Sequence, residues 1–146
     1  IRINGFEQFT QLYGVVVGED VLKFTALLLC DLLRRHSGED DFVGQMVVGP
    51  YFVVVSSPAR IEAIAAELMA RFDADIRLHY GYQDIQQGRA PQMALSVAVL
   101  SDADGPFADI RELTEAAETL LTAPPSPDGT RRSAVRCAAL PTSRPR

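Results

Sequence analysis

The stretch in which catalytic side chains would first be sought runs from Phe42 to Ser57. It reads Phe-Val-Gly-Gln-Met-Val-Val-Gly-Pro-Tyr-Phe-Val-Val-Val-Ser-Ser and predicts two Val-rich strands folded over a turn at Gly49-Pro50, because β-branched side chains pack well on a buried sheet. Enzymes often place chemistry at such a hairpin tip. Here no residue from Gly44 to Ser57 carries a charge. The segment offers neither an acid to hold a metal ion nor a base to move a proton.

Two histidines and two cysteines complete the set of reactive side chains. His36 is expected to interact with a helix dipole, and His79 to be an exposed strand residue. Neither has a cysteine or carboxylate at the spacing of a metal site. Cys30 is expected to be a small buried hydrophobic residue, and Cys137 lies in a polar segment. We therefore expect no metal, no cofactor, no disulfide framework and a reducing, cytoplasmic setting.

Length and composition indicate one domain. A chain of 146 residues, 47% of them apolar, can bury one ordinary core. Its longest apolar runs are far shorter than the roughly 18 residues of a membrane-spanning helix, and its start lacks a signal-peptide pattern. We expect no membrane contact by this domain.

The charge is distributed unevenly along the chain. Residues 131–146 hold five of the 14 basic side chains and no acid, so the rest of the chain holds nine basic side chains against 19 acidic ones. Nine minus 19 gives this body a charge near −10. Such a body is not expected to bind nucleic acid or other polyanions.

The first third of the chain predicts a strand and two helices. Ile1–Ile3 is expected to be the end of a strand that starts outside this sequence, and Asn4 to cap a short helix that stops at Gly14. A long, largely buried helix is expected from Gly18 to His36, with acids at its start and basic residues at its end. One stripe of that helix faces the core: Val21, Phe24, Leu28 and Leu32.

The remainder predicts alternating strands and helices after the hairpin. Ser57-Pro58 opens a helix, Leu78–Tyr82 alternates as a weak strand, Met93–Leu100 suits a central strand, and a last helix starts at Phe107. The element order favours an α+β sandwich of the ferredoxin-like kind, with a mainly antiparallel central sheet flanked by helices. Residues 124–146 are rich in Pro, Ser and Arg and are expected to form a linker or disordered tail.

Several local patterns, in order and spacing, resemble those of the GGDEF domain family, the bacterial diguanylate cyclases. The likeness covers about residues 1–123. Its pieces are Ile3-Asn4-Gly5-Phe6 with Phe9, Tyr13-Gly14, Gly18-Glu19-Asp20-Val21-Leu22, Asp41-Phe42-Val43-Gly44, Phe52-Val53-Val54-Val55 and Pro91-Gln92-Met93-Ala94-Leu95-Ser96-Val97-Ala98-Val99. The resemblance implies a nucleotidyl-cyclase-like fold and, in active members, condensation of two GTP molecules into cyclic di-GMP by a dimer.

The residues that the family uses for this chemistry are replaced here. The resemblance places the first metal carboxylate at Arg2 and aligns the signature turn, Gly-Gly-Asp/Glu-Glu-Phe, with Val48-Gly49-Pro50-Tyr51-Phe52, so that Pro50 takes the place of the metal-binding acid. A shift of one residue in the hairpin register supplies no acid either. Pro50 also removes a backbone donor, and Val48 is expected to fill the phosphate cradle.

The nucleotide-reading positions are altered as well. The resemblance places the guanine-reading residues at Thr10 and Glu19, and Glu7 stands where a phosphate-facing Lys is usual. The inhibitory Arg-x-x-Asp of many relatives is replaced by Glu39-Asp40-Asp41-Phe42. The vestigial substrate site thus comprises Arg2, Thr10, Glu19, Val48, Gly49, Pro50 and Tyr51, with no catalytic residue.

We therefore predict an inactive GGDEF-like domain that serves as a regulatory or dimerisation module in a bacterial cyclic di-GMP signalling protein. The resemblance implies pairing with itself or with a flanking domain such as a cyclic di-GMP phosphodiesterase. Two alternatives stay open. One is an unrelated ferredoxin-like binding domain, in which case Met93–Leu100 would not share a sheet with Val47 and Val53; the other is an active cyclase with atypical metal ligands.

Overall fold

The computed structural model describes residues 1–36 and 40–122, and the backbone of 135–136. Most of the expected tail, 124–146, lies outside the described residues, as do Cys137 and part of the loop before the hairpin. Two residues of that expected tail form a short strand, β5 (Val135–Arg136). The part of the chain that carries the candidate site is described continuously on both sides of the gap at 37–39.

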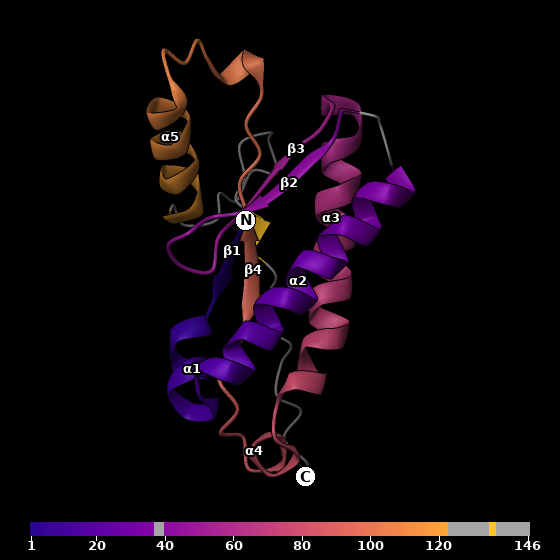
Figure 1. Cartoon of the computed structure of the whole chain (residues 1–146), viewed down its shortest axis with the longest axis vertical. Coiled ribbons are helices and arrows are strands. Elements are labelled where there is room, and N and C mark those ends of the chain that lie inside the picture. The colour runs from indigo at the N-terminus through magenta and orange to yellow at the C-terminus, as the bar shows by residue number, and fades with distance from the viewer. Residues whose placement is uncertain (37–39, 123–134, 137–146) are drawn as a thin grey trace, which may run out of the picture.

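The elements follow each other as strands and helices of an α+β protein (Figure 1). In order they are β1 (Arg2–Asn4), α1 (Phe6–Tyr13), α2 (Val15–His36), β2 (Phe42–Gln45), β3 (Phe52–Val55), α3 (Pro58–Asp75), the 3-10 helix η1 (Ile76–His79), α4 (Tyr82–Gln86), β4 (Ala94–Val97), the 3-10 helix η2 (Asp102–Asp104), α5 (Ile110–Thr122) and β5. The predicted α+β class is confirmed. None of the described helices is both long and apolar enough to cross a membrane.

The strands form two small antiparallel sheets rather than one uninterrupted sheet. One sheet has the order β1-β4-β5, and the other is the β2-β3 hairpin. A single antiparallel bridge between Arg2 and Tyr51 connects them. The expected continuous sheet, with Met93–Leu100 and the hairpin side by side, is therefore present only as two sheets that meet at β1.

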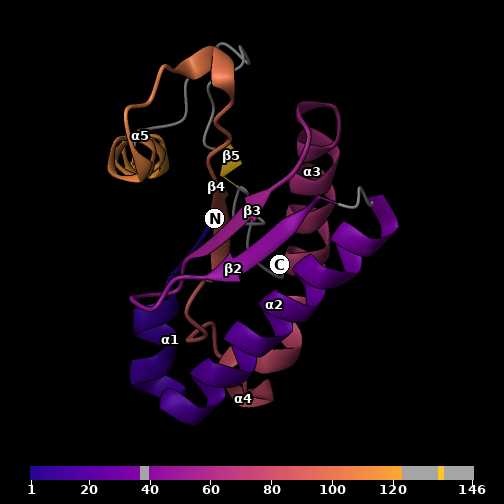
Figure 2. The ribbon, with the colours of Figure 1, turned by 45° about the horizontal axis from the view of Figure 1, so that its top comes forward.

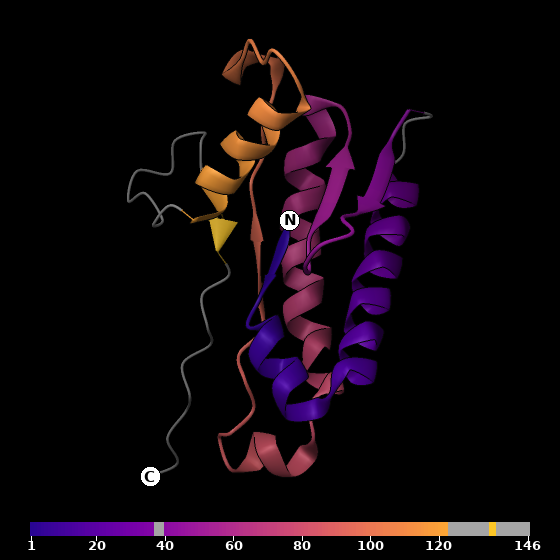
Figure 3. The same cartoon turned by 60° about the vertical axis from the view of Figure 1, so that its left-hand side comes forward.

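The hydrophobic core lies between the strands and two long helices. α2 and α3 lie side by side and contact each other (Figure 1), whereas α5 lies on the other side of β4 (Figure 3). Figure 2 shows the hairpin crossing the molecule beside α2. The predicted stripe of α2 is largely confirmed, because Val21, Leu28 and Leu32 are buried and Phe24 packs half-buried against the core.

Two expectations about the first helices are wrong in detail. Asn4 does not cap α1; it belongs to β1, and the N-cap is Gly5 with φ 75°. α1 and α2 are separated only by Gly14, so α2 starts three residues before the expected Gly18. Because Gly14 has φ 89° and its N–H donates to the Thr10 carbonyl, it ends α1 and immediately allows a second helix.

The expected strand at Leu78–Tyr82 is also wrong. This segment forms η1 and the start of α4. The alternation of Leu78, Tyr80 and Tyr82 does not mark a buried face, since Leu78 is 83% and Tyr82 75% exposed. Only Tyr80 turns inward, where its ring lies against Phe9.

The helix-opening role of Ser57-Pro58 is confirmed, with Ser57 at the N-cap and Pro58 at the first position. The strong strand expected within Met93–Leu100 is also present as β4, with Leu95, Ser96 and Val97 buried. The last helix starts at Ile110 rather than Phe107. Much of its apolar stripe is uncovered, since Ile110 is 72% exposed.

Candidate functional site

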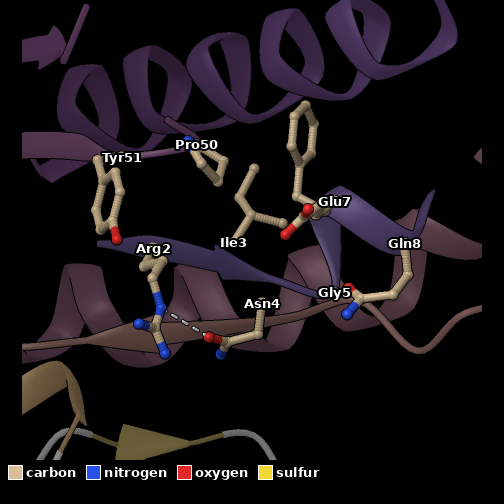
Figure 4. A pocket seen from close by; sticks show the side chains of 9 residues that line it. Arg2, Ile3, Asn4, Gly5, Glu7, Gln8, Pro50 and Tyr51 are labelled. Atoms are coloured by element: carbon tan, nitrogen blue, oxygen red, sulfur yellow. Dashed lines mark hydrogen bonds between the residues drawn. The ribbon is translucent and has the colours of Figure 1, made fainter. Parts of the chain in front are cut away.

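A shallow pocket of about 290 Å³ lies where β1, the start of α1 and the hairpin meet. Figure 4 shows Pro50 and Tyr51 on one side of β1 and Glu7 and Gln8 beyond its end. The full lining is Arg2, Ile3, Asn4, Gly5, Phe6, Glu7, Gln8, Pro50 and Tyr51.

Backbone hydrogen bonds hold the hairpin against β1 at this pocket. The Ile3 N–H donates to the Pro50 carbonyl at 3.0 Å, and the Phe52 N–H donates to the Ile1 carbonyl at 2.9 Å. These two bonds flank the Arg2–Tyr51 bridge. Since Ile3 and Phe52 are each 2% exposed, the bridge is fixed on both sides by core side chains.

A polar chain runs from the pocket into the sheet. Arg2 Nε donates to Asn4 Oδ1 at 2.9 Å, and Asn4 Nδ2 donates to Ser96 Oγ at 2.6 Å. Ser96 is fully buried on β4, and Asn4 lies near it because Asn4 pairs with Ala94 in the sheet. Asn4 therefore orients the guanidinium of Arg2 (Figure 4).

Gly5 lets the chain turn from β1 into α1 at the edge of the pocket. Its φ is 75°, and a Cβ at this position would collide with the Gln92 carbonyl oxygen. Only glycine combines this backbone conformation with so close an approach. The turn places Glu7 and Gln8, on the first turn of α1, beside Arg2 and Asn4 in the pocket lining.

Three of the seven residues expected in the vestigial substrate site come together here. Arg2, Pro50 and Tyr51 line the pocket, although Arg2 is distant from the other two in sequence. Val48 does not line it and is 80% exposed, so the expectation that its side chain fills the site is wrong. Gly49 is an exposed turn residue with φ 79°.

Thr10 and Glu19 lie outside the pocket, at the junction of α1 and α2. The Thr10 methyl group and the Phe6 ring both lie against Gly18, which precedes the exposed Glu19. The Thr10 hydroxyl donates to the Glu7 carbonyl at 2.9 Å within its own helix. Phe6 thus contributes to both places, and the expected guanine-reading residues are neighbours of the pocket rather than part of it.

The chemistry available at the pocket is limited to binding. Its lining contains one cation, Arg2, one carboxylate, Glu7, and no histidine or cysteine. Among the described residues no group of three histidine, cysteine or acidic side chains could hold a metal ion. Arg2 can attract a negatively charged group, which Glu7 opposes, and no side chain of the lining pairs a nucleophile with a base.

The histidines and Cys30 differ in part from expectation. His36 ends α2, as expected, but its Nε2 lies 2.8 Å from Glu67 Oε2 on α3. His79 is half-buried in η1 and its ring lies 5.0 Å from that of Phe24, so it is not an exposed strand residue. Cys30 is half-buried rather than fully buried.

A second polar group joins α2 to α3 outside the pocket. Asp31 Oδ2 accepts from Arg71 Nη1 at 2.7 Å and lies 3.0 Å from Arg35 Nη2. The hydrogen bond from Arg71, helped by the charge of Arg35, lowers the pKa of Asp31. This group ties two helices together.

Sequence reasoning missed Asn4 and Gln8 as pocket residues. Asn4 had been assigned to a helix cap, and its alternation with Arg2 on a strand was the available signal. Nothing in the pattern around Gln8 marks it, because an exposed glutamine on a first helical turn is common.

Comparisons of the chain with models of known families, with curated proteins and with solved structures find no match. The proposals below depend on the residues of this chain.

Proposed function

We propose that this chain is a degenerate GGDEF-like domain that does not make cyclic di-GMP and acts as a regulatory or dimerisation module in a bacterial signalling protein. Its expected partners are a second copy or a flanking domain, such as a cyclic di-GMP phosphodiesterase, in the cytoplasm.

The observation that carries this proposal is the meeting of Arg2 and Pro50 in one pocket. The sequence resemblance assigns these two positions to the two carboxylates of one metal site, although nothing local connects them. In the structure the Pro50 carbonyl accepts from the N–H of Ile3, next to Arg2. The positions are thus close enough to serve one ion, as the resemblance requires.

The strand arrangement gives further support. If the Arg2–Tyr51 bridge is counted, the strands follow the order β4-β1-β3-β2 with every neighbouring pair antiparallel. Helices connect β1 to β2 and β3 to β4. This order and these connections are those of a ferredoxin-like sandwich, to which the proposed nucleotidyl-cyclase-like fold belongs.

The proposed loss of activity follows from the charges at the two positions. A metal ion in such a reaction stabilises transition-state charge by several kcal/mol and activates the attacking hydroxyl. Arg2 places a cation where the ion would lie, and Pro50 offers no ligand. Because each 1.36 kcal/mol is tenfold in rate, the loss of both carboxylates reduces turnover by many orders of magnitude.

A metal-binding gain tests the site assignment directly. The variant Arg2→Asp/Pro50→Asp should bind Mn²⁺, measured by calorimetry, whereas wild-type protein should not. The matched control is Arg2→Asp/Val48→Asp, which adds the same charge but places its second acid outside the pocket. If both double variants bind Mn²⁺ equally, the pocket is not the counterpart of a cyclase metal site.

Turnover and nucleotide binding test the proposed inactivity. Wild-type protein incubated with GTP and Mn²⁺ should yield no cyclic dinucleotide and should show no low-micromolar GTP affinity. Product formation would establish the active alternative. For the regulatory role, Arg2→Ala in the complete protein should leave folding intact and change the activity of any neighbouring phosphodiesterase domain only through contact between domains.

The alternative of an unrelated binding domain is favoured by one observation, the separation of the hairpin from the β1-β4-β5 sheet. Under that alternative the pocket has no metal-site ancestry. The Mn²⁺ comparison above therefore decides between the two.

A further inference from the structure

The hairpin has an unpaired edge at β2. In the antiparallel pairing, Gly44 lies opposite Val53 and Gln45 lies opposite Phe52. The Met46 N–H donates to the Tyr51 carbonyl, and the Phe52 N–H points the other way, to Ile1. Since the hydrogen-bonding direction alternates along a strand, the backbone groups of Val43 and Gln45 point away from β3.

These outward groups have no partner in the structure. None of the backbone hydrogen bonds found outside the regular elements of the described chain involves Val43 or Gln45. Both β1 and β4 lie on the opposite side of β3, and Figure 2 shows β2 on the α2 side of the hairpin. Natural proteins usually protect such an edge with charge, proline or a bulge, and β2 has none of these.

The outer face of the hairpin next to this edge is apolar and uncharged. Phe42 is 58%, Val53 42% and Val55 56% exposed, while the inner-facing Phe52 is buried. The Phe42 ring extends over Gly44, because a Cβ on Gly44 would lie 3.0 Å from it. From Gly44 to Ser57 the chain carries no charge.

The edge is complementary to itself. If two copies of β2 pair antiparallel about a two-fold axis at Gly44, Val43 of one copy exchanges backbone hydrogen bonds with Gln45 of the other, and the reverse. Gly44 then faces its own copy as a non-hydrogen-bonded pair, where the Cα atoms approach to about 4.5 Å. Glycine leaves room there, and Phe42 comes opposite Met46 of the second copy.

Charge favours the same occupant. A body near −10 repels a second copy over most of its surface, as the counts of nine basic and 19 acidic side chains outside 131–146 imply. The uncharged hairpin brings no like charges together. Asp41, at the start of the hairpin, is in contact with Arg60 at 3.0 Å.

We propose that β2 pairs with β2 of a second copy of this chain, joining the two hairpins into one four-stranded sheet centred on Gly44. This inference deepens the proposed dimerisation role, and it names the surface involved. It does not depend on the ancestry of the Arg2 pocket, so the Mn²⁺ and GTP results neither support nor overturn it.

Sedimentation velocity with an edge-blocking variant is the first test. Wild-type protein should sediment as a concentration-dependent dimer, and Gln45→Pro should sediment as a monomer. Proline removes only the outward N–H of Gln45, so the hairpin keeps its own hydrogen bonds. The control Gln45→Ala keeps the N–H and should remain dimeric. Far-ultraviolet circular dichroism checks that Gln45→Pro is folded.

Cross-linking provides a second test that does not need the proline variant. Gly44→Cys, oxidised under mild conditions, should form a disulfide-linked dimer through residue 44, identified by mass spectrometry of the linked peptide. Val53→Cys is the matched control: it lies opposite Gly44 within the hairpin and is exposed on the same face, but it is one strand away from the edge. It should not cross-link.

Three results would overturn the proposal: a wild-type monomer at every concentration reached, a dimer that survives Gln45→Pro, or equal cross-linking at 44 and 53. A wild-type monomer whose Val43 and Gln45 amides become protected from hydrogen exchange only when another protein is added would assign the edge to a different partner. That outcome would also exclude pairing between copies.

Discussion

Arg2 and Tyr51 face each other across an antiparallel bridge that is the only strand contact between the two sheets in the described chain. The two hydrogen bonds beside it, Ile3 to Pro50 and Phe52 to Ile1, are 3.0 and 2.9 Å long. Everything that the pocket brings together from distant parts of the sequence depends on this bridge.

The bridge should behave as one opening unit in hydrogen exchange. We expect the Ile3 and Phe52 amides to exchange slowly and with similar protection, because both are buried and both are released when the hairpin separates from β1. Nuclear magnetic resonance of the exchanging amides measures this. Fast exchange of Phe52 alongside slow exchange of Ile3 would show that the hairpin is not held against β1.

Gly5→Ala should destabilise the protein more than Gly88→Ala. Both glycines have positive φ, 75° and 65°, so both changes carry a backbone penalty of about 1–2 kcal/mol. A Cβ at Gly5 also collides with the backbone of Gln92, whereas at Gly88 it meets nothing within 4 Å. Urea unfolding of the two variants measures the difference, and equal losses would contradict the tight turn between β1 and α1.

Tyr80→Phe should reduce the free energy of unfolding by about 1–3 kcal/mol, because it leaves a buried N–H without its partner. The Tyr80 hydroxyl accepts from the Met93 N–H at 2.9 Å, and Met93 is 5% exposed. The control Tyr82→Phe, on a 75% exposed ring, should have little effect. Thermal unfolding of both variants compares them.

The same burial raises the pKa of Tyr80, and burial together with the Asp84 hydrogen bond raises the pKa of Tyr13. A raised folded-state pKa means that stability is complete below the ordinary tyrosine pKa and falls as pH rises through the folded value. Ultraviolet titration should show two tyrosines that ionise later than the others. Removal of one late step by Tyr80→Phe assigns it.

The contribution of Asp31 should depend on pH. Its pKa lies below the usual 3.8 because Arg71, and secondarily Arg35, stabilise the carboxylate. A lowered folded-state pKa contributes stability above the unfolded pKa and loses it as pH falls through the folded one. Asp31→Asn should therefore destabilise at neutral pH and have progressively less effect on acidification below about pH 4.

Asp20→Asn is the control for that measurement. Asp20 is 59% exposed and lies 3.6 Å from Lys23 on the same helix, a type of pair that contributes little. Urea unfolding at neutral and acidic pH compares the two variants. An Asp31→Asn effect that does not change with pH would show that the carboxylate's charge is not what ties α2 to α3.

Leu68→Ala should cost about 2–5 kcal/mol, the usual range for a large cavity in a core. Leu68 is fully buried on α3. Leu27→Ala, at a 68% exposed position of α2, changes the same side chain where no cavity forms and should cost far less. Denaturant unfolding of both variants measures how much of the stability lies between α2 and α3.

The sequence predicts those parts of the fold whose signal is periodic and long. The stripe containing Val21, Leu28 and Leu32 repeats over several helical turns, and only a helix can bury it on one side. The hairpin was predictable from two Val-rich runs around a Gly-Pro turn. In both cases local preference and tertiary burial agree.

Short segments were not predictable in the same way. The alternation of Leu78 with Tyr80 covers too few residues to distinguish a strand from a 3-10 turn, and only exposure resolves it. Asn4 suits a helix cap and a strand equally well, and its partner Ser96 lies far away in sequence. The pocket depends on such long-range neighbours, so only the resemblance, and no local pattern, suggested that Arg2 and Pro50 belong together.

The contact between β1 and the hairpin is made by main-chain atoms, with side chains at positions 2 and 51 left outside its hydrogen bonds. Evolution can therefore replace those side chains without disturbing the scaffold that presents them. A lineage can lose one activity at this place, and later acquire another, while its architecture stays the same.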